Sequence, residues 1–229
     1  MTRGEWVAIS QRQVTFPHRS ETGDYLDREW YGLEAFRGRR LLAVPNSLDA
    51  ARRTLSGLHL AAVVLTGGND VPSAPEPQDL APGRDAVESW LLDRAEAQGT
   101  PVIGVCRGAQ LIASRCGARL VDGGHAHAGT RHLVRAVGVA PWRWPETFTV
   151  ASHHRWALPA VGLPERLRPL ALAPDDTVEA FAHRDRPWWG LMWHPEREFP
   201  AGPAADALTH LLNHRDGLSV RPNQKEHTA

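Results

Sequence analysis

The sequence lacks several features that mark particular classes of protein. Its 229 residues include 26 basic and 26 acidic side chains, so no net charge attracts nucleic acid or an anionic membrane. No apolar run approaches the roughly 18 residues of a membrane span, and the first residues lack the apolar core of a signal peptide. We therefore expect a cytoplasmic protein whose partners include neither nucleic acid nor a membrane.

Cysteine is also scarce, with only Cys106 and Cys116 present. If both lie on one helix, their Cα atoms are about 15 Å apart, which is too far for a disulfide. Internal repeats, low-complexity segments and interdomain linkers are missing as well. The sequence therefore predicts free thiols and one domain over residues 1–214, followed by a loose polar tail at 215–229.

Short apolar stretches alternate with helical patterns in the first half of the chain. Strands are predicted at 6–10, 41–45, 61–66 and 102–105, and helices at 21–36 and 84–98. The last two strands are nearly continuous Val, Leu and Ile runs, typical of parallel strands buried on both faces. The alternation predicts an α/β fold, an open doubly wound and mostly parallel sheet flanked by helices, with ligands at the carboxyl ends of its strands.

The second half has shorter strands separated by Pro, Asp and Gly turns, which predicts a small antiparallel extension of the sheet. These strands are expected at 147–151, 167–173, 177–182 and 188–193, before a closing helix at 204–214. Six tryptophans lie in this half, at 142, 144, 156, 188, 189 and 193. They form either a wall that faces a substrate or, as we favour, large core residues.

The most informative segment is Val-Ile-Gly-Val-Cys-Arg-Gly-Ala-Gln, at 102–110. An apolar strand breaks at Cys106, and a glycine and helix-forming residues follow at once. This order predicts a nucleophile elbow, a tight strand-to-helix turn that exposes one side chain. The helix N-terminus favours a thiolate, and the N–H of Arg107 would point to a developing oxyanion. A structural cysteine beside a glycine turn is the alternative.

Three other strand ends carry reactive or shaping groups. Gly67 and Gly68 allow the backbone to approach a ligand, although an ordinary glycine turn has the same composition. His194 and Glu196 lie two residues apart after the last strand, so Glu196 can hold one ring nitrogen while the other faces Cys106. The third strand end is Ser-His-His at 152–154, a pattern that on its own is more typical of a surface loop.

Together, these strand ends resemble those of the class I glutamine amidotransferase and γ-glutamyl hydrolase superfamily, over residues 6–212. The resemblance implies a flavodoxin-like three-layer fold and no metal or other cofactor. It assigns a catalytic triad to Cys106, His194 and Glu196. It assigns the two oxyanion amides to Gly68 and Arg107.

The same resemblance assigns the amino-acid end of a γ-glutamyl substrate to Gln110, Ser152 and His154. Thr-Gly-Gly-Asn-Asp (66–70), Val-Glu-Ala-Phe (178–181) and Gly-Leu-Met-Trp-His-Pro-Glu (190–196) are similar to the γ-glutamyl-γ-aminobutyrate hydrolase-like branch, peptidase C26.

A narrower resemblance, to γ-glutamyl-CDP-amidate hydrolases, comes from the segments 9–12, 21–30 and 45–46 and from a His-x-Gly…His loop. It places the leaving group against Gln11, Arg12 and Asp27. It also suggests His127 and His132 as substrate-binding residues, but the sequence does not say whether either of them touches the substrate. Asp27 and Trp30 equally suit packing of a first helix. Arg12, Arg19 and Arg28 are the basic groups of this segment, and the sequence does not select one for a phosphate. The chain departs from the pattern with Thr22 and Gly23 in place of two arginines, and with Ala151 in place of Asn.

The predicted function is a cysteine-dependent hydrolase that cleaves a γ-glutamyl–nitrogen bond through a glutamyl thioester. The small-molecule substrate could be γ-glutamyl-CDP-amidate, which would yield glutamate and cytidine diphosphoramidate. A glutaminase subunit that delivers ammonia to a partner synthetase is the alternative, and a non-catalytic binding protein is a third. The sequence does not fix the leaving group or the oligomeric state.

Metal binding is the remaining interpretation for a chain with twelve histidines. His125, His127 and His132 have suitable spacing, and His210 and His214 form an i, i+4 pair. The first three lie in a glycine-rich loop without a nearby Cys or Glu ligand. The second pair lies on an amphipathic helix, where solvated positions are common, so the prediction is that no metal is bound.

Overall fold

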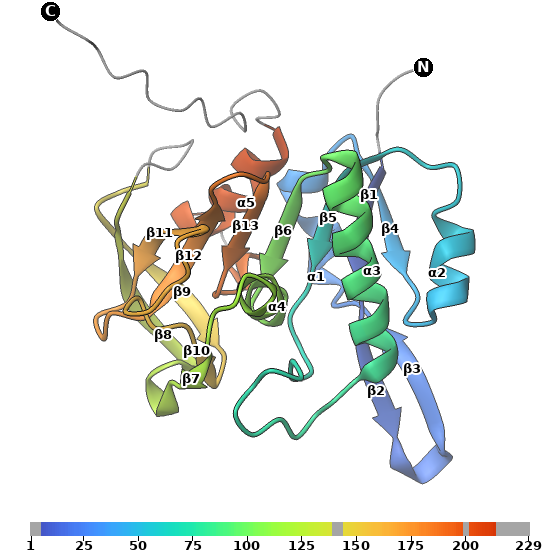
Figure 1. Cartoon of the computed structure of the whole chain (residues 1–229), viewed down its shortest axis with the longest axis horizontal. Coiled ribbons are helices and arrows are strands. Elements are labelled where there is room, and N and C mark those ends of the chain that lie inside the picture. Colours follow the sequence, from blue (N-terminus) through green and yellow to red (C-terminus); the bar gives the residue numbers. More distant parts are fainter. Residues whose placement is uncertain (1–5, 139–143, 199–201, 214–229) are drawn as a thin grey trace, which may run out of the picture.

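Figure 1 shows the computed structural model of the chain, which describes residues 6–138, 144–198 and 202–213. In these residues, nine strands form one sheet in the order β4-β1-β5-β6-β13-β12-β11-β8-β9. The first five are parallel neighbours: β4 Arg40–Val44, β1 Trp6–Ser10, β5 Leu60–Leu65, β6 Val102–Val105 and β13 Trp188–Leu191. The predicted parallel sheet and its four strands in the first half are confirmed, each within one residue.

The sheet continues through four antiparallel strands. These are β12 Val178–His183, β11 Leu167–Leu172, β8 Ala128–Ala136 and β9 Thr147–His153. The sequence predicted three of them but missed β8, because most of its side chains are exposed and only Val134 is fully buried. A separate two-stranded sheet pairs β7 Val121–Asp122 with β10 Trp156–Ala157.

The helix predicted at 21–36 is wrong. Glu21–Tyr25 is instead strand β3, which pairs antiparallel with β2 Arg12–Phe16 in a hairpin that projects from the body of the molecule (Figure 1). Only α1 Glu29–Gly32 and the 3-10 turn η2 Glu34–Phe36 are helical. Leu26 and Leu33 pack against the same core as Trp30. The apolar residues of this segment are spaced as in a helix, but they belong to a strand, a loop and two short helical turns.

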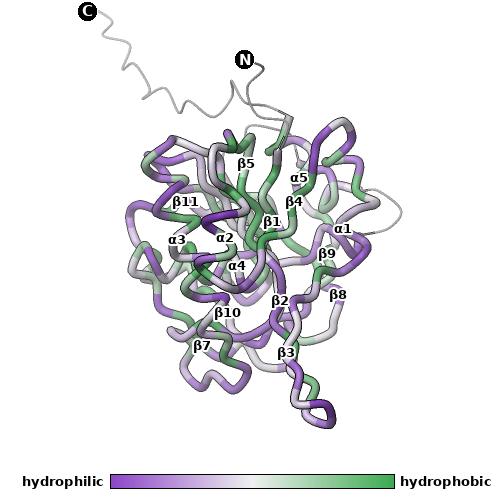
Figure 2. Tube along the Cα trace, turned by 90° about the vertical axis from the view of Figure 1, so that its right-hand side faces the viewer, coloured by the Kyte–Doolittle hydropathy of each residue, from purple (hydrophilic) through white to green (hydrophobic). Residues whose placement is uncertain are grey.

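Helices cover both faces of the sheet. Strands alternate their side chains between two cores, as β1 does with Val7 and Ile9 on one side and Ala8 on the other. Helices α2 Leu48–Thr54, α3 Pro82–Gln98 and α4 Arg107–Arg115 pack on the second side, and α1 and α5 Pro203–Asn213 on the first (Figure 1). Hydrophobic residues follow the central strands, whereas the hairpin and outer loops are largely hydrophilic (Figure 2).

The tryptophans of the second half mainly build these cores. Trp156, Trp188, Trp189 and Trp193 are buried, and Trp144 packs partly buried against Trp193. Trp142, the tail at 215–229 and the last residue of the predicted closing helix lie outside the described residues. The described part of the chain contains no helix that is both long and apolar enough to cross a membrane.

Candidate active site

Cys106 lies at the turn between β6 and α4, at the carboxyl edge of the parallel sheet. Its φ of 50° and ψ of −106° are strained values for a residue with a side chain, as expected of a nucleophile elbow. Two glycines allow the turn: a Cβ on Gly104 would lie 2.5 Å from the backbone of Gly108, and a Cβ on Gly108 would overlap the carbonyl of Leu65. The strand and helix can therefore approach closely only with glycine at both positions.

His194 contacts Cys106 from the end of the neighbouring strand β13. Its ring interacts electrostatically with the Cys106 side chain, and its Nδ1–H donates to Glu196 Oε1 at 2.6 Å. Both side chains are buried, at 6% and 3% exposure. Burial opposes a charge on the ring, but the Cys106 sulfur and the Glu196 carboxylate outweigh it and raise the pKa of His194 to about 10. The ring is thus held as an acid directed at the sulfur.

Gly67 provides the space in which these groups meet. A Cβ at this position would lie 2.6 Å from His194 Cε1 and 3.4 Å from the Cys106 Cβ. Gly68 follows with a φ of +80°, and a Cβ there would meet the methylenes of Arg12. The glycine pair predicted at the end of β5 therefore has no room for side chains.

Arg84, which was not among the predicted site residues, binds the backbone of the segment 66–68. Its buried guanidinium donates to the carbonyl oxygens of Thr66 at 2.6 Å, Gly67 at 3.0 Å and Gly68. Since a trans peptide directs its N–H opposite to its C=O, the N–H of Gly68 points away from Arg84. The available signal was a charged pair, Arg84 and Glu88, within the buried stripe of helix α3.

The side chain of Arg107 belongs to the same buried network and leaves only its backbone N–H for a ligand. Its guanidinium pairs with Glu88 and Asp85, and Glu88 also binds Arg84 Nε at 2.8 Å. Burial raises the pKa of Asp85 and, for Arg84, lowers the pKa to about 10. For Glu88, burial acts in the same upward sense but Arg107 and Arg84 outweigh it, so its pKa is lowered. The two guanidiniums and the two carboxylates of this network therefore neutralise each other's charge next to the turn that carries Cys106.

A cavity opens beside His194 on the hairpin side of the site. Its lining consists of Arg12, Tyr25, Leu26, Asp27, Trp30, Thr66, Gly67, Gly68, His194, Glu196 and Arg197. Of the residues expected around the leaving group, Arg12 and Asp27 line this cavity. Gln11 does not, because its side chain donates to the carbonyl of Val44 at 3.0 Å. Arg19 and Arg28 are not among the lining residues, whereas Arg197 is.

The residues expected at the amino-acid end of the substrate are buried and bonded within the protein. Gln110 Nε2 donates to the carbonyl of Trp156 at 2.9 Å, and Ser152 Oγ to that of His127 at 2.7 Å. His154 Nδ1 also donates to Trp156, at 3.1 Å. None of these three residues lines the cavity beside His194. His153, which the sequence analysis passed over, packs its ring edge-on against His194 with centroids 5.5 Å apart.

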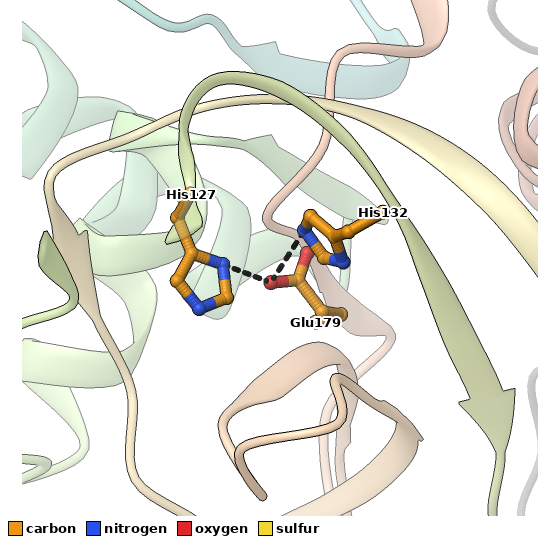
Figure 3. Close-up of side chains that lie close together, drawn as sticks. All are labelled: His127, His132 and Glu179. Atoms are coloured by element: carbon orange, nitrogen blue, oxygen red, sulfur yellow. Dashed lines mark ion pairs between the residues drawn. The ribbon is translucent and has the colours of Figure 1, made fainter. Parts of the chain in front are cut away.

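His127 and His132 lie away from this cavity, in a second polar cluster with Glu179 (Figure 3). His127 Nδ1 is 3.1 Å from Glu179 Oε1, and His132 Nε2 is 3.6 Å from the same oxygen. Burial raises the pKa of Glu179, but His127 and His154 outweigh it and lower that pKa to about 2. The sequence near the histidine-rich loop offers no Cys or Glu, but β12 brings the Glu179 carboxylate to it from some 50 residues further along the chain.

Solved structures share this fold. A glutamine amidotransferase from Thermotoga maritima matches with a TM-score of 0.63, covering 83% of this chain and 76% of that one at 16% identity. A second glutamine amidotransferase, from Methylobacillus flagellatus, gives a TM-score of 0.56 over 85% of this chain and 72% of that one, at 18% identity. The chain therefore has the fold of the class I glutamine amidotransferases.

Sequence comparison narrows this class. The family model of peptidase C26 matches residues 23–196, and the chain belongs to that family. The chain is 30% identical to the γ-glutamyl-CDP-amidate hydrolase of Campylobacter jejuni, over 84% of this chain and 90% of the relative. It is also 30% identical to one subunit of the glutamine-hydrolysing GMP synthase of Thermoplasma acidophilum, over 77% and 80%. The family expected from the sequence motifs is thereby confirmed.

Proposed function

We propose that this chain is a cysteine-dependent hydrolase that cleaves a γ-glutamyl–nitrogen bond and releases glutamate. The observation that carries the proposal is the contact of Cys106, strained at a strand-to-helix elbow, with a buried His194 that Glu196 holds at 2.6 Å. A nucleophile, a base and a group that orients the base are the elements that thiol-dependent acyl transfer requires.

The reaction follows from this arrangement. The Cys106 sulfur attacks the γ-carbonyl carbon, and the N–H groups of Gly68 and Arg107 stabilise the oxyanion; one such donor is typically worth about 3 kcal/mol of barrier. His194 protonates the leaving nitrogen, so the C–N bond breaks and a glutamyl thioester forms. His194, now neutral, takes a proton from water, whose oxygen attacks the thioester. Glutamate leaves and Cys106 regains its proton-sharing contact with His194.

For the leaving group, we propose a nucleotide-linked amidate of the γ-glutamyl-CDP-amidate type. Two guanidiniums, those of Arg12 and Arg197, line the cavity on the hairpin side of His194, where a diphosphate would follow the scissile nitrogen. Guanidinium groups match phosphate oxygens in geometry and charge. The C. jejuni relative bears the name of a hydrolase of this compound, which supports the same leaving group.

The chemistry is tested by replacing each of the two cysteines. Cys106→Ala should abolish glutamate release, whereas Cys116→Ala, at the other end of helix α4, should keep it. A Cys106→Ala protein that is folded and still releases glutamate at the wild-type rate would refute the mechanism. Trapping of the glutamyl thioester by mass spectrometry in the wild type but not in Cys106→Ala gives an independent readout.

The leaving group is tested by phosphorus NMR with γ-glutamyl-CDP-amidate. We expect conversion to the free amidate, with Arg12→Gln and Arg197→Gln raising the KM for this compound more than the KM for L-glutamine. An unchanged spectrum after prolonged incubation with an enzyme that hydrolyses other γ-glutamyl amides would reject the nucleotide leaving group and leave the hydrolase intact.

A glutaminase subunit is the second candidate, favoured by the identity to the GMP synthase subunit of T. acidophilum. The two candidates differ in their need for a partner. A subunit of this kind would turn over L-glutamine only when a synthetase is added, whereas the proposed hydrolase acts alone.

A further inference from the structure

Three histidines surround the buried carboxylate of Glu179 on the antiparallel side of the sheet. Figure 3 shows two of them, His127 and His132. His127 Nδ1, His132 Nε2 and His154 Nε2 lie 3.1, 3.6 and 3.4 Å from the single oxygen Oε1. Glu179 is fully buried, and His127 and His154 are nearly so. The proposed hydrolase mechanism uses neither this carboxylate nor these nitrogens.

The proton positions on these rings follow from the opposite nitrogens. His127 Nε2 lies 2.9 Å from the Asp175 carboxylate, His154 Nδ1 3.1 Å from the Trp156 carbonyl and His132 Nδ1 3.3 Å from the Leu133 carbonyl. Carboxylate and carbonyl oxygens only accept, so each of these nitrogens carries the proton of the neutral ring.

The nitrogens that face Glu179 are therefore bare lone pairs when the rings are neutral. Among the described residues they have no hydrogen-bond partner, and neither oxygen of Glu179 has one. Lone pairs directed at a carboxylate oxygen in a buried site repel it, and buried polar groups without partners are rare. The group that would satisfy all of them at once is a cation.

We propose that His127, His132 and Glu179 bind a divalent metal ion of the zinc class, with His154 as a fourth donor. Bonds of 2.0–2.1 Å in a tetrahedral site place neighbouring ligand atoms about 3.4 Å apart, close to the three separations around Glu179 Oε1. The ligand atoms of His127, His132 and Glu179 lie within 4.8 Å of one another, so a bound ion would draw them closer together. Imidazole nitrogens with a carboxylate oxygen suit Zn²⁺ and exclude Ca²⁺ and Mg²⁺, which take oxygen ligands.

The surroundings of the cluster support a metal centre. A metal-bound histidine commonly donates its second nitrogen to a carboxylate or a carbonyl, which fixes the ring, and each of these three histidines has such a partner. The competitor for the cation is a proton, since Glu179, against the effect of burial, raises the pKa of His127 to about 9. The metal and that proton are mutually exclusive on Nδ1.

The site would tie together three strands next to the catalytic histidine. His132 lies on β8, His154 directly follows β9, and Glu179 lies on β12. The carbonyl of Glu179 accepts the N–H of Met192 at 2.7 Å, two residues before His194. We therefore assign the ion a structural role: it fixes the segment after β9 and the strand that carries His194.

Metal content decides the proposal without any substrate. The full chain, with any affinity tag removed, is equilibrated with Zn²⁺, gel-filtered and analysed by mass spectrometry of the elements. The measurement uses a chain with the Cys106→Ala substitution, so that Cys106 and His194 cannot bind the ion together. We expect about one zinc per chain, and Glu179→Gln to weaken binding by more than the 10- to 100-fold typical of losing an outer-shell partner.

The matched control is His125→Gln. His125 is exposed in the same loop, two residues from His127, and should keep full zinc content. Asp175→Asn should lower affinity by about 10- to 100-fold through the His127 ring. Equal zinc in Glu179→Gln and its parent would overturn the site.

A second measurement guards against variants that do not fold. Co²⁺ added to the metal-free, otherwise unsubstituted Cys106→Ala chain should give the intense visible absorption of a tetrahedral nitrogen and oxygen site, and Zn²⁺ should displace it. If neither ion binds, and nitrogen NMR shows His127 doubly protonated in excess Zn²⁺, the cluster is a protonated ion pair and the proposal fails. Loss of the site would leave the hydrolase mechanism standing, because metal content is read without turnover.

Discussion

The described residues contain two buried clusters of charged or titratable side chains, and the charges in the two clusters are compensated differently. In the first, Arg84 and Arg107 are matched by Glu88 and Asp85, so every guanidinium has a carboxylate partner. In the second, three rings direct at Glu179 nitrogens that carry no proton when the rings are neutral. In the first cluster the charges are matched side chain by side chain, although Arg107 Nε has no hydrogen-bond partner among the described residues, whereas the second needs a proton or a metal ion to be stable.

The two clusters also differ in what they support. Arg84 holds the carbonyls of segment 66–68 and so places the Gly68 N–H, which acts directly on the proposed oxyanion. The histidine cluster reaches His194, the proposed catalytic histidine, through the backbone bond from Met192 to Glu179 on β12 and through His153 at the end of β9, whose ring packs against His194. The paired arginines and carboxylates thus lie directly beside the proposed oxyanion segment. The histidine cluster, which could take up a proton or a metal ion, is centred on β12, on the far side of β13.

Breaking the complete cluster should have the largest effect. Glu88→Gln leaves the buried guanidiniums of Arg84 and Arg107 without their shared carboxylate. Removing one partner of a buried ion pair typically costs 3–5 kcal/mol, so we expect the free energy of unfolding to fall by about that amount. Urea denaturation followed by circular dichroism measures it.

The control lies on the same helix. Asp93 pairs with Arg115 at the surface of α3, where its side chain is 64% exposed. Asp93→Asn should cost less than about 1 kcal/mol. If the two amide substitutions destabilise the protein equally, the distinction between a buried and an exposed pair on this helix is wrong.

The support of the oxyanion segment can be weakened without removing its charge. Arg84→Lys keeps the cation but loses the planar fork that reaches three successive carbonyls. Loss of an oxyanion donor costs about 100- to 1000-fold in kcat. A donor that is merely held less firmly should cost about 10- to 100-fold, with little change in KM.

Arg94→Lys is the matched control for this loss. Arg94 lies on the same helix and also binds backbone carbonyls, those of Leu55 and Leu58 at 3.0 and 2.7 Å, but away from the site. It should leave kcat unchanged. Equal losses of kcat in both variants would mean that Arg84 acts through general stability, not through the Gly68 amide.

The sequence predicted the strand ends around Cys106 better than it predicted the histidine cluster. Cys106, Gly68 and His194 each follow a continuous apolar run, and parallel strands bring their carboxyl ends to one edge, so local patterns were sufficient. Arg84 was missed because a cation in an apolar stripe looks like a solvated position until its carbonyl partners are known.

The histidine cluster could not be predicted in the same way. Its ligands come from a loop, from the exposed strand β8, from the end of β9 and from β12, and only antiparallel pairing brings them together. The hairpin of β2 and β3 was misread as part of a helix for a related reason, since its strand partner, not its own periodicity, determines its structure.

The smallest expected effect concerns His194, which shares one property with each cluster. Like the arginines, it is buried beside partners of opposite charge. Like the histidines around Glu179, it can gain or lose a proton. Its pKa of about 10 lies above its ordinary value of 6.5, despite burial, because of Cys106 and Glu196. The proton it gains stabilises the folded chain fully below pH 6.5, and this contribution is lost as the pH rises through about 10. Glu196→Gln removes one of the two negative partners, so the pKa of His194 should fall.

We expect this variant to lose about 1–2 kcal/mol of unfolding free energy near pH 6, because each tenfold change in proton affinity is worth about 1.4 kcal/mol. The difference from the wild type should shrink as the pH rises through about 10, because above that pH neither protein keeps the proton. NMR titration of the His194 ring and urea unfolding across this range report the same equilibrium. A difference in stability that stays constant with pH would show that Glu196 stabilises the fold by packing and hydrogen bonding alone, and not by holding a charge on His194.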